Sequence, residues 1–209
     1  MSTTPCAMGS AMETELKLGL VKAEALDDLM AALPTPTAVI EQTNHYFVDD
    51  GGVLVANRTM LRVRESRRLD TEGDPTVVLT LKRRLRATDG YFIAQEEECP
   101  VALNDWRAVQ RGERDLGSLD PPPLAALPID TPVRCHGVMV NRRHVVHLEG
   151  YVLEVDRTEL PGGRVDAEVE VETDDPEGAR RLVQGRADAA GVELFPQTRG
   201  KYARFRAAL

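Results

Sequence analysis

Three charged residues near the N-terminus, Glu13, Glu15 and Lys17, alternate with uncharged ones. If this stretch is a β-strand, the three side chains point to one face, because the side-chain period of a strand is two. Two carboxylates can hold a hard divalent cation such as Mg²⁺, and a lysine ammonium can neutralise a phosphate oxygen. Taken alone, the pattern is more typical of a solvated strand face.

Two basic pairs have the same alternating spacing. One residue separates Arg62 from Arg64, and one residue separates Lys82 from Arg84. On a strand each pair presents two cations to one face, where a guanidinium can hold phosphate oxygens with two parallel hydrogen bonds. A solvated edge strand protected by positive charge has the same pattern. The neighbouring arginines are assigned to solvent or to the rim of a site: Arg67, Arg68, Arg83 and Arg86.

Acidic residues also alternate along the chain. One group comprises Glu96 and Glu98, and the other comprises Glu168, Glu170 and Glu172. Like charges this close on one strand face repel, so they need either cations among them or full exposure to water. One such group alone is more typical of a solvated face. Acidic and basic strands in the same chain, however, favour a site that holds both an anion and cations.

Most of the elements that position these residues are predicted to be strands. Apolar and polar residues alternate in four segments, which are residues 60–64, 76–82, 145–155 and 167–172. A break at Glu149-Gly150 predicts a hairpin, and residues 161–163 predict a turn. Helical spacing predicts helices over residues 21–33, 104–110 and 176–190. Residues 117–132 are predicted to form an irregular connection.

These strands can bury their apolar faces in two ways. An ordinary sheet buries the apolar face and leaves the charged face wet. A barrel closed the other way round turns the charged faces into a lumen, while helices cover the apolar outside. Alternation alone does not choose between these arrangements.

The composition limits the class of protein. A chain of 209 residues suits one domain, and a formal net charge of −8 argues against a general nucleic-acid binder. No apolar run approaches the ~18 residues of a membrane span, and the N-terminus does not resemble a secretory signal. We therefore expect a cytoplasmic protein. Cys6, Cys99 and Cys135 lie far apart and are expected to be free thiols.

Several segments together resemble the CYTH superfamily, the triphosphate tunnel metalloenzymes. Glu13-Thr14-Glu15-Leu16-Lys17 resembles the ExExK signature of this family. Further elements follow in the family's order over nearly the whole chain: a tyrosine-and-aspartate strand at 44–49, an LRxR strand at 61–64, a TLK strand at 79–82, Glu96 with Glu98, an aspartate strand at 153–157, an ExE strand at 168–172, and Gly200-Lys201-Tyr202 in place of an SKY element. Gly200 replaces the usual serine, and Val48 separates Phe47 from Asp49, but neither departure removes a charged residue.

The resemblance implies the fold and the roles of the charged residues. The fold would be α+β, an eight-stranded antiparallel β tunnel (closed barrel) with a charged lumen and flanking helices. A single domain would span residues 1–209, with 1–10 as a flexible N-terminal extension. The phosphate-binding residues would be Lys17, Arg62, Arg64, Lys82, Lys201, one of Arg142 and Arg143, and in addition Arg84. The ligands of Mg²⁺ or Mn²⁺ would be Glu13, Glu15, Glu170 and Glu172. Further residues lining the tunnel would be Glu96, Glu98, Glu154, Asp156 and Glu168.

The activity implied by the resemblance is metal-dependent hydrolysis of a small triphosphate, either inorganic triphosphate or thiamine triphosphate. Lys17, Glu170 and Asp156 would be the catalytic groups, with Glu170 or Asp156 orienting the attacking water. A class IV adenylate cyclase that forms cyclic AMP and pyrophosphate from ATP is one alternative, although an aromatic content of 4% offers little for an adenine site. A non-catalytic polyphosphate-binding module is the other. No nucleic-acid or membrane partner is expected, and a homodimer is a possible assembly.

Overall fold

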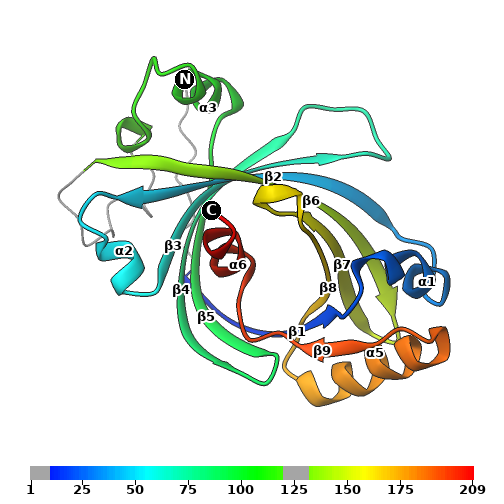
Figure 1. Cartoon of the computed structure of the whole chain (residues 1–209). Helices are drawn as coiled ribbons and strands as arrows, with labels where there is room; N and C mark the ends of the chain where they lie inside the picture. Colours follow the sequence, from blue (N-terminus) through cyan, green and yellow to red (C-terminus); the bar gives the residue numbers. More distant parts are fainter. Residues whose placement is uncertain (1–9, 120–131) are drawn as a thin grey trace.

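The computed structural model describes residues 10–119 and 132–209, and its main element is a closed antiparallel barrel (Figure 1). Eight strands form a ring in the order β5-β4-β3-β2-β6-β7-β8-β1, and β1 pairs again with β5. A short strand, β9, adds to β1. The strands are β1 (Ser10–Leu20), β2 (Ala38–Asp49), β3 (Thr59–Arg68), β4 (Thr76–Thr88), β5 (Tyr91–Pro100), β6 (Val133–Leu148), β7 (Tyr151–Glu159), β8 (Val165–Glu172) and β9 (Leu194–Pro196).

Closure of the barrel depends on β1, because this strand pairs with both neighbours. Its first part lies beside β5, with Glu13 opposite Ala94, and its later part lies beside β8, with Lys17 opposite Glu170. A closed barrel has no free strand edge, and side chains alternate between its inside and its outside. The register therefore places the charged side chains of β1 beside those of β8 in the same lumen.

Two tight turns set the register of the hairpins that flank the lumen. Asp89 and Gly90 join β4 to β5 with φ values of 48° and 81°, and Glu149 and Gly150 join β6 to β7 with φ values of 50° and 88°. Two-residue turns with both φ values positive match the right-handed twist of paired strands. The hairpin predicted at Glu149-Gly150 is confirmed.

Two apolar layers cover the outside of the barrel. Helices α1 (Leu26–Ala31) and α5 (Pro176–Ala190) pack on the outer faces of β1, β6, β7 and β8, where Val183 of α5 is buried with Leu16 and Val169. Helices α2 (Val53–Ala56) and α3 (Leu103–Gln110) pack on β2, β3 and β4, where Trp106 is 2% exposed. Because the apolar faces of the strands point outward, the charged faces line the inside.

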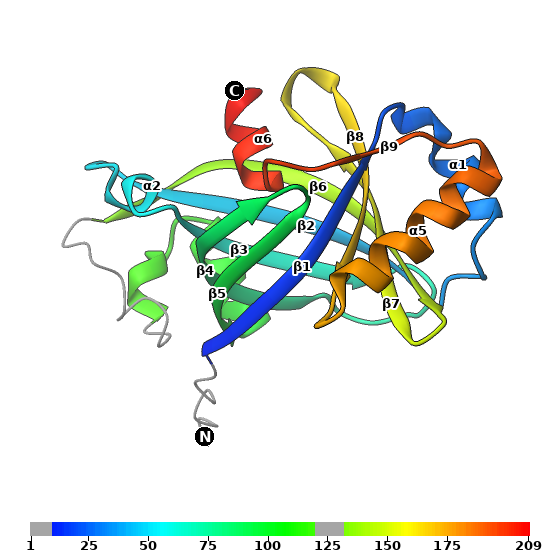
Figure 2. The same ribbon diagram turned by 90° about the horizontal axis from the view of Figure 1, so that it is seen from below.

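The last helix, α6 (Lys201–Ala207), lies inside the ring of strands in Figure 1 and at one end of the barrel in Figure 2. Its Phe205 is 1% exposed and packs with Tyr46 and Met139 from the inner faces of β2 and β6. Gly137 of β6 makes room for this ring, since a Cβ atom there would lie 2.6 Å from Phe205 Cζ. The helix therefore partly fills one mouth of the tunnel.

The helices differ in part from the sequence prediction. The helices predicted at 104–110 and 176–190 are confirmed as α3 and α5. In place of one helix over 21–33, the chain forms a 3-10 turn at Ala23–Ala25 followed by α1. Val21 instead extends the pairing of β1 with the chain around β9, since its N–H donates to the Glu193 carbonyl. Helices α2 and α6 were not predicted, since each spans only one or two turns.

Asp49 explains how so short a helix as α2 is held. Both of its carboxylate oxygens accept N–H groups at the start of the helix, from Val53 and Leu54. Burial alone would raise the pKa of Asp49, but these backbone hydrogen bonds lower it. Asp49 thus caps a helix and does not line the lumen.

Some predictions lie outside the described residues. These are the N-terminal extension, Cys6 and most of the connection predicted over 117–132, where the structure describes a 3-10 turn at Leu116–Leu119. No helix within the described ranges is long and apolar enough to cross a bilayer.

Candidate functional site: a charged tunnel

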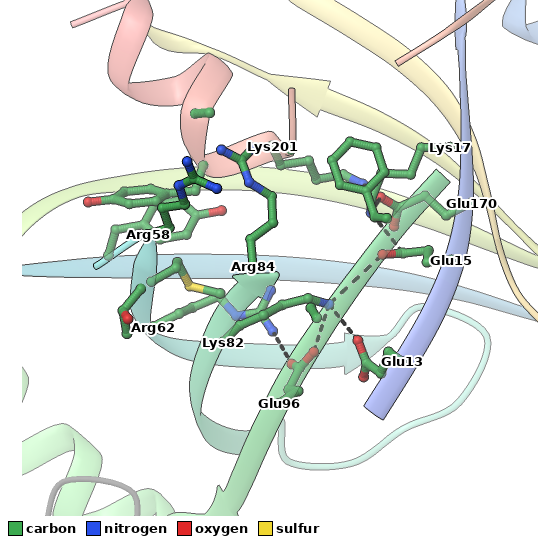
Figure 3. A pocket seen from close by; sticks show the side chains of 18 of the residues that line it. Glu13, Glu15, Lys17, Arg58, Arg62, Lys82, Arg84, Glu96, Glu170 and Lys201 are labelled. Atoms are coloured by element: carbon green, nitrogen blue, oxygen red, sulfur yellow. Dashed lines mark hydrogen bonds and ion pairs between the residues drawn. The ribbon is translucent and has the colours of Figure 1, made fainter. Parts of the chain in front are cut away.

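The lumen contains a cavity of about 460 Å³, a size typical of small-molecule sites. Charged side chains from the inner faces of β1, β3, β4, β5, β6, β7 and β8 and from α6 line it (Figure 3). The predicted residues among them are Glu13, Glu15, Lys17, Arg62, Arg64, Lys82, Arg84, Glu96, Glu98, Arg143, Glu154, Glu170, Glu172 and Lys201. Asp156 and Glu168 lie deeper in the wall and contact Lys201.

One group of opposite charges, the Lys82 cluster, comprises Lys82, Glu13, Glu15 and Glu96 (Figure 3). The Lys82 ammonium stands among the three carboxylates, with N–O distances of 2.6 Å to Glu13, 2.7 Å to Glu96 and 3.9 Å to Glu15. Burial alone would lower the pKa of Lys82, but the surrounding carboxylates hold it well above its ordinary value. Lys82 therefore stays charged and is the cation of this group.

Two carboxyl groups of the Lys82 cluster share one proton. Burial and a hydrogen bond with Glu96 raise the pKa of Glu13 to about 7, against the attraction of Lys82. Burial alone would raise the pKa of Glu96 as well, but Lys82 and the hydrogen bond from Glu13 lower it to about 2. A single ammonium is thus not enough to keep all the surrounding carboxyl groups ionised. Glu13 is the carboxyl group that takes up a proton most readily.

A second group, the Lys201 cluster, comprises Lys201, Asp156, Glu168 and Glu170. The ammonium of Lys201 lies close to all three carboxylates, with N–O distances of 2.5 Å to Glu168, 2.7 Å to Asp156 and 2.8 Å to Glu170. Burial alone would lower the pKa of Lys201, but these carboxylates raise it. Carboxylate oxygens of the three acids lie within 4.8 Å of one another, so the ammonium occupies the position that a metal ion would need.

Arg143 closes the Lys201 cluster from β6. Its guanidinium donates two parallel hydrogen bonds to Asp156, at 2.8 and 2.6 Å, and a third to Glu170 at 2.7 Å. Burial alone would raise the pKa values of Asp156 and Glu170, but the surrounding cations hold both below their ordinary values. Lys17 also contacts Glu170, and it lies 2.7 Å from Glu15, which connects the two clusters.

Arg62 and Arg64 donate their hydrogen bonds to neutral side chains. Arg64 Nε donates to the Asn44 amide oxygen at 3.1 Å, and Arg62 donates to the Thr80 hydroxyl at 3.1 Å. Arg62 is also 3.6 Å from Glu96, but Arg64 has no carboxylate partner within the described ranges. Burial, with repulsion from Arg62 and Arg143, lowers the pKa of Arg64 to about 10. Arg64 is thus a partly buried cation that donates to a neutral amide.

The structure decides two ambiguities of register. Arg143 is buried in the lumen, whereas its neighbour Arg142 is exposed outside it. All three glutamates of β8 share the lumen side, but they lie at different depths: Glu168 is 1% exposed and Glu172 is exposed opposite Glu15. The sequence predicted that either Arg142 or Arg143 contacts phosphate, and the position of Arg142 outside the lumen does not suit this contact.

Sequence reasoning missed several residues that orient the predicted ones. Asn44 and Thr80 hold the arginines of β3, and their period-two positions on β2 and β4 were the available signal. Arg204 contacts Glu168 at 2.8 Å and lies three residues after Lys201, which puts both on one face of α6. Arg58 and Arg206 also line the cavity, and no periodic pattern marked them.

The carboxylates fit a divalent ion better in the Lys82 cluster than in the Lys201 cluster. Glu15 Oε2 is buried and has no hydrogen-bond partner among the described residues, and Lys82 Nζ is 3.9 Å away from it. A buried carboxylate oxygen without a donor is costly unless something else neutralises it. Glu13, Glu15 and Glu172 offer oxygen ligands of the kind that Mg²⁺ and Mn²⁺ prefer.

Comparison with solved structures places the fold among known proteins. A proposed adenylyl cyclase from Hippeastrum, described as having a dominant triphosphatase activity, is 27% identical with a TM-score of 0.81, and the match covers 93% of this chain and 95% of that one. A proposed adenylate cyclase from Bacillus halodurans is 21% identical with a TM-score of 0.64, over 93% and 98% of the two chains. The protein PH1819 from Pyrococcus horikoshii is 19% identical with a TM-score of 0.62, over 94% and 99%.

Comparison with curated protein sequences gave no match. The family profile described as the CYTH domain matches residues 11–192, which include every strand of the closed ring except the first residue of β1. The closed eight-stranded barrel and its charged lumen agree with this match. The chain belongs to the CYTH domain family.

Proposed function

We propose that this protein hydrolyses a small triphosphate inside the tunnel with the help of a divalent metal ion, inorganic triphosphate or thiamine triphosphate being the substrate. The observation that carries the proposal is Arg64, a partly buried cation of the lumen whose hydrogen bond goes to the Asn44 amide and not to a carboxylate. Keeping an uncompensated cation in a low-dielectric site is unfavourable unless an anion binds there. The dominant triphosphatase activity of the Hippeastrum protein supports the choice of reaction.

The basic residues of the lumen would bind the phosphates. Arg62 and Arg64 are fixed by Asn44 and Thr80, so they meet an incoming phosphate without first breaking a strong ion pair. Lys17, Lys82 and Lys201 would each exchange a carboxylate for a phosphate oxygen. These cations would neutralise the charge on the phosphoryl oxygens as the terminal bond breaks.

The acidic residues would hold the metal and the nucleophile. Of the four predicted ligands we retain Glu13, Glu15 and Glu172. Glu170 is left out because Lys17, Arg143 and Lys201 already contact its carboxylate. A bound Mg²⁺ or Mn²⁺ would supply Lewis-acid stabilisation of the phosphoryl charge. Glu170 and Asp156 were predicted to orient the water, but their lowered pKa values make them weak proton acceptors. We assign to them the positioning of Lys201 and Arg143. Glu13, with a pKa of about 7 in the metal-free protein, would lose its proton when the metal ion binds.

A product analysis tests this proposal. Purified protein is incubated with inorganic triphosphate, thiamine triphosphate or ATP and with Mg²⁺ or Mn²⁺, and the products are identified. We expect release of orthophosphate, and a reduction in metal affinity on the order of 10- to 100-fold in Glu15→Gln. Glu97→Gln, on β5 but outside the set of lining residues, is the matched control and should behave like the wild type. Wild-type metal affinity in Glu15→Gln would contradict the ligand assignment.

The same assay separates the alternative functions. Cyclic AMP and pyrophosphate from ATP would identify a cyclase, and tight binding of triphosphate without turnover would identify a binding module. An adenine site needs an accessible apolar or aromatic surface. Tyr46 of β2 and Tyr202 of α6 pack against each other with ring centroids 4.6 Å apart, which disfavours stacking of a base between them.

A further inference from the structure

Three arginines surround the mouth of the tunnel at the end where α6 lies. Arg58 precedes β3, Arg84 lies on β4 and Arg206 lies on α6, and all three line the same cavity. In Figure 3 the side chains of Arg58 and Arg84 extend toward one another, beside Lys201 and away from Glu13 and Glu96. We call Arg58, Arg84 and Arg206 the mouth arginines.

The two ends of the cavity differ in charge. The mouth arginines lie near the beginning of β3 and the later part of β4, which are adjacent because Met60 pairs with Lys82 and Thr59 with Arg83. Exposed carboxylates come from the other ends of neighbouring strands, Glu98 from late in β5 and Glu172 from the end of β8. A chain of phosphates with its metal at the acidic end would therefore extend toward the basic mouth.

The mouth arginines have no carboxylate partner within the part of the chain that the structure describes. This is unlike many exposed arginines of the same protein, which pair with an acid close in sequence. Examples are Arg68 with Asp70 at 2.7 Å and Arg111 with Glu113 at 2.7 Å. In a protein with a net charge of −8, three unpaired arginines around one opening form a local anion-attracting surface.

The backbone fixes the position of two mouth arginines. Arg58 has a φ of 55°, in the left-handed region that is costly for a residue with a side chain. Its carbonyl accepts a hydrogen bond of 3.2 Å from the N–H of Arg84. This contact ties the turn before β3 to β4 and presents both guanidinium groups to the same opening.

The mouth is less suited to an organic group. Tyr202 has Tyr46 4.6 Å away between ring centroids and the Arg206 guanidinium 5.8 Å from its own centroid. Phe205 is buried, so it offers no surface to a ligand. A cationic group such as a thiazolium ring would meet the like charges of the mouth arginines. These features favour a further anionic group over a nucleobase or a cation.

We propose that the mouth arginines bind the phosphate groups beyond the third of a linear inorganic polyphosphate, so that the protein prefers chains longer than triphosphate. This inference rests on the proposed binding of a triphosphate in the lumen. Arginine suits the role, since its planar fork can hold two oxygens of one phosphate and keeps its charge at any physiological pH.

Calorimetric binding of inorganic triphosphate and inorganic tetraphosphate tests the inference, on protein in EDTA so that no turnover occurs. For the wild type we expect tetraphosphate to bind about tenfold more tightly than triphosphate, from at least one added charge-assisted contact. In Arg58→Ala and Arg206→Ala the ratio of the two affinities should fall about three- to fivefold each, and Arg58→Lys should restore most of it. Arg86→Ala, on β4 and absent from the cavity lining, is the matched control.

The outcomes distinguish this inference from the proposed function. Triphosphate binding with no preference for tetraphosphate, or an unchanged ratio in both variants, would overturn the role of the mouth arginines and leave the lumen assignment intact. ATP binding more tightly than tetraphosphate would likewise overturn it in favour of an organic substituent. Failure of the wild type to bind either phosphate would contradict the proposed function itself, and this inference with it.

Discussion

At the scale of single residues, the tunnel contains charged groups whose ionised form is energetically unfavourable in the folded protein. Glu13 has a pKa of about 7 because burial and the neighbouring Glu96 oppose its ionisation, and Arg64 has a pKa of about 10 because burial and the nearby Arg62 and Arg143 oppose its charge. A fold selected only for stability would replace such groups with neutral ones. The proposed binding of a cation near Glu13 and of an anion near Arg64 would relieve these unfavourable energies.

We expect Glu13→Gln to stabilise the metal-free protein above about pH 7. The pKa of Glu13 is raised from 4.5 in the unfolded chain to about 7 in the folded protein, so the folded state binds the proton more tightly. The stability from this protonated carboxyl is present below pH 4.5 and is lost as pH rises through 7. Glutamine stays neutral, so the variant should gain on the order of 1 kcal/mol over the wild type at pH 8 and little at pH 4.5.

Urea unfolding in EDTA at the two pH values measures this difference. Glu97→Gln serves as the control, because Glu97 is not among the residues lining the cavity. It should change the free energy of unfolding by the same amount at both pH values. A Glu13→Gln protein less stable than the wild type at pH 8 would show that the pairing with Lys82 outweighs the cost of burial.

At the scale of elements, α6 carries site residues on two faces. Lys201 and Arg204 bind the acidic residues of β7 and β8, while Phe205 anchors the helix between Tyr46 and Gly137. A helix of seven residues has little stability of its own, so its position depends on these contacts. Packing of Phe205 therefore controls the placement of Lys201 in the lumen.

We expect Gly137→Ala to loosen α6. The new Cβ would lie 2.6 Å from Phe205 Cζ, and Phe205 is too closely packed to move away freely. Overpacking of this kind costs about 1–3 kcal/mol. Limited proteolysis should cleave the C-terminus of the variant faster, and its melting temperature should fall.

Gly185→Ala on α5 is the matched substitution. No atom lies within 4 Å of the added Cβ, so this change should stabilise the helix by about 0.5–1 kcal/mol. Equal protease resistance of Gly137→Ala and the wild type would mean that α6 adapts without leaving the mouth.

At the scale of the whole molecule, the barrel balances opposite charges inside one lumen. Lys82 and Lys201 each stand where a cluster of carboxylates would otherwise attract a metal ion. A metal ion that binds alone must displace an ammonium, and a phosphate that binds alone must remove that ammonium from its carboxylates. Binding of both together exchanges partners and leaves every charge compensated.

We therefore expect the metal and the triphosphate to bind cooperatively. Thermal unfolding would be measured with Mg²⁺ alone, with a non-hydrolysable imido analogue of triphosphate in EDTA, and with both. The combined stabilisation should exceed the sum of the separate ones by about 1–3 kcal/mol, the usual size of a coupling free energy. Additive shifts would show that the two ligands occupy independent sites.

The sequence by itself determined the strands and the set of charged residues. Alternation at Glu13, Glu15 and Lys17 or at Arg62 and Arg64 fixes which side chains share a face, because that depends only on the period of a strand. The hairpin at Glu149-Gly150 was also local, since two adjacent residues in left-handed conformations define it. The resemblance to the CYTH family then gave the closed barrel, which alternation could not.

The tertiary structure alone decided which charges meet. Glu13 and Lys82 are 69 residues apart and Lys17 and Glu170 are 153 apart, so their contacts depend on the closure of β1 onto β5 and β8. The inward position of Arg143 depends on the register of β6. The position of Lys201 in the lumen depends on the packing of Phe205 against Tyr46 and Gly137. Depth and electrostatic environment arise from long-range packing. These two properties, and not residue type, separate the carboxylates that we propose as metal ligands from those that only hold a lysine in place.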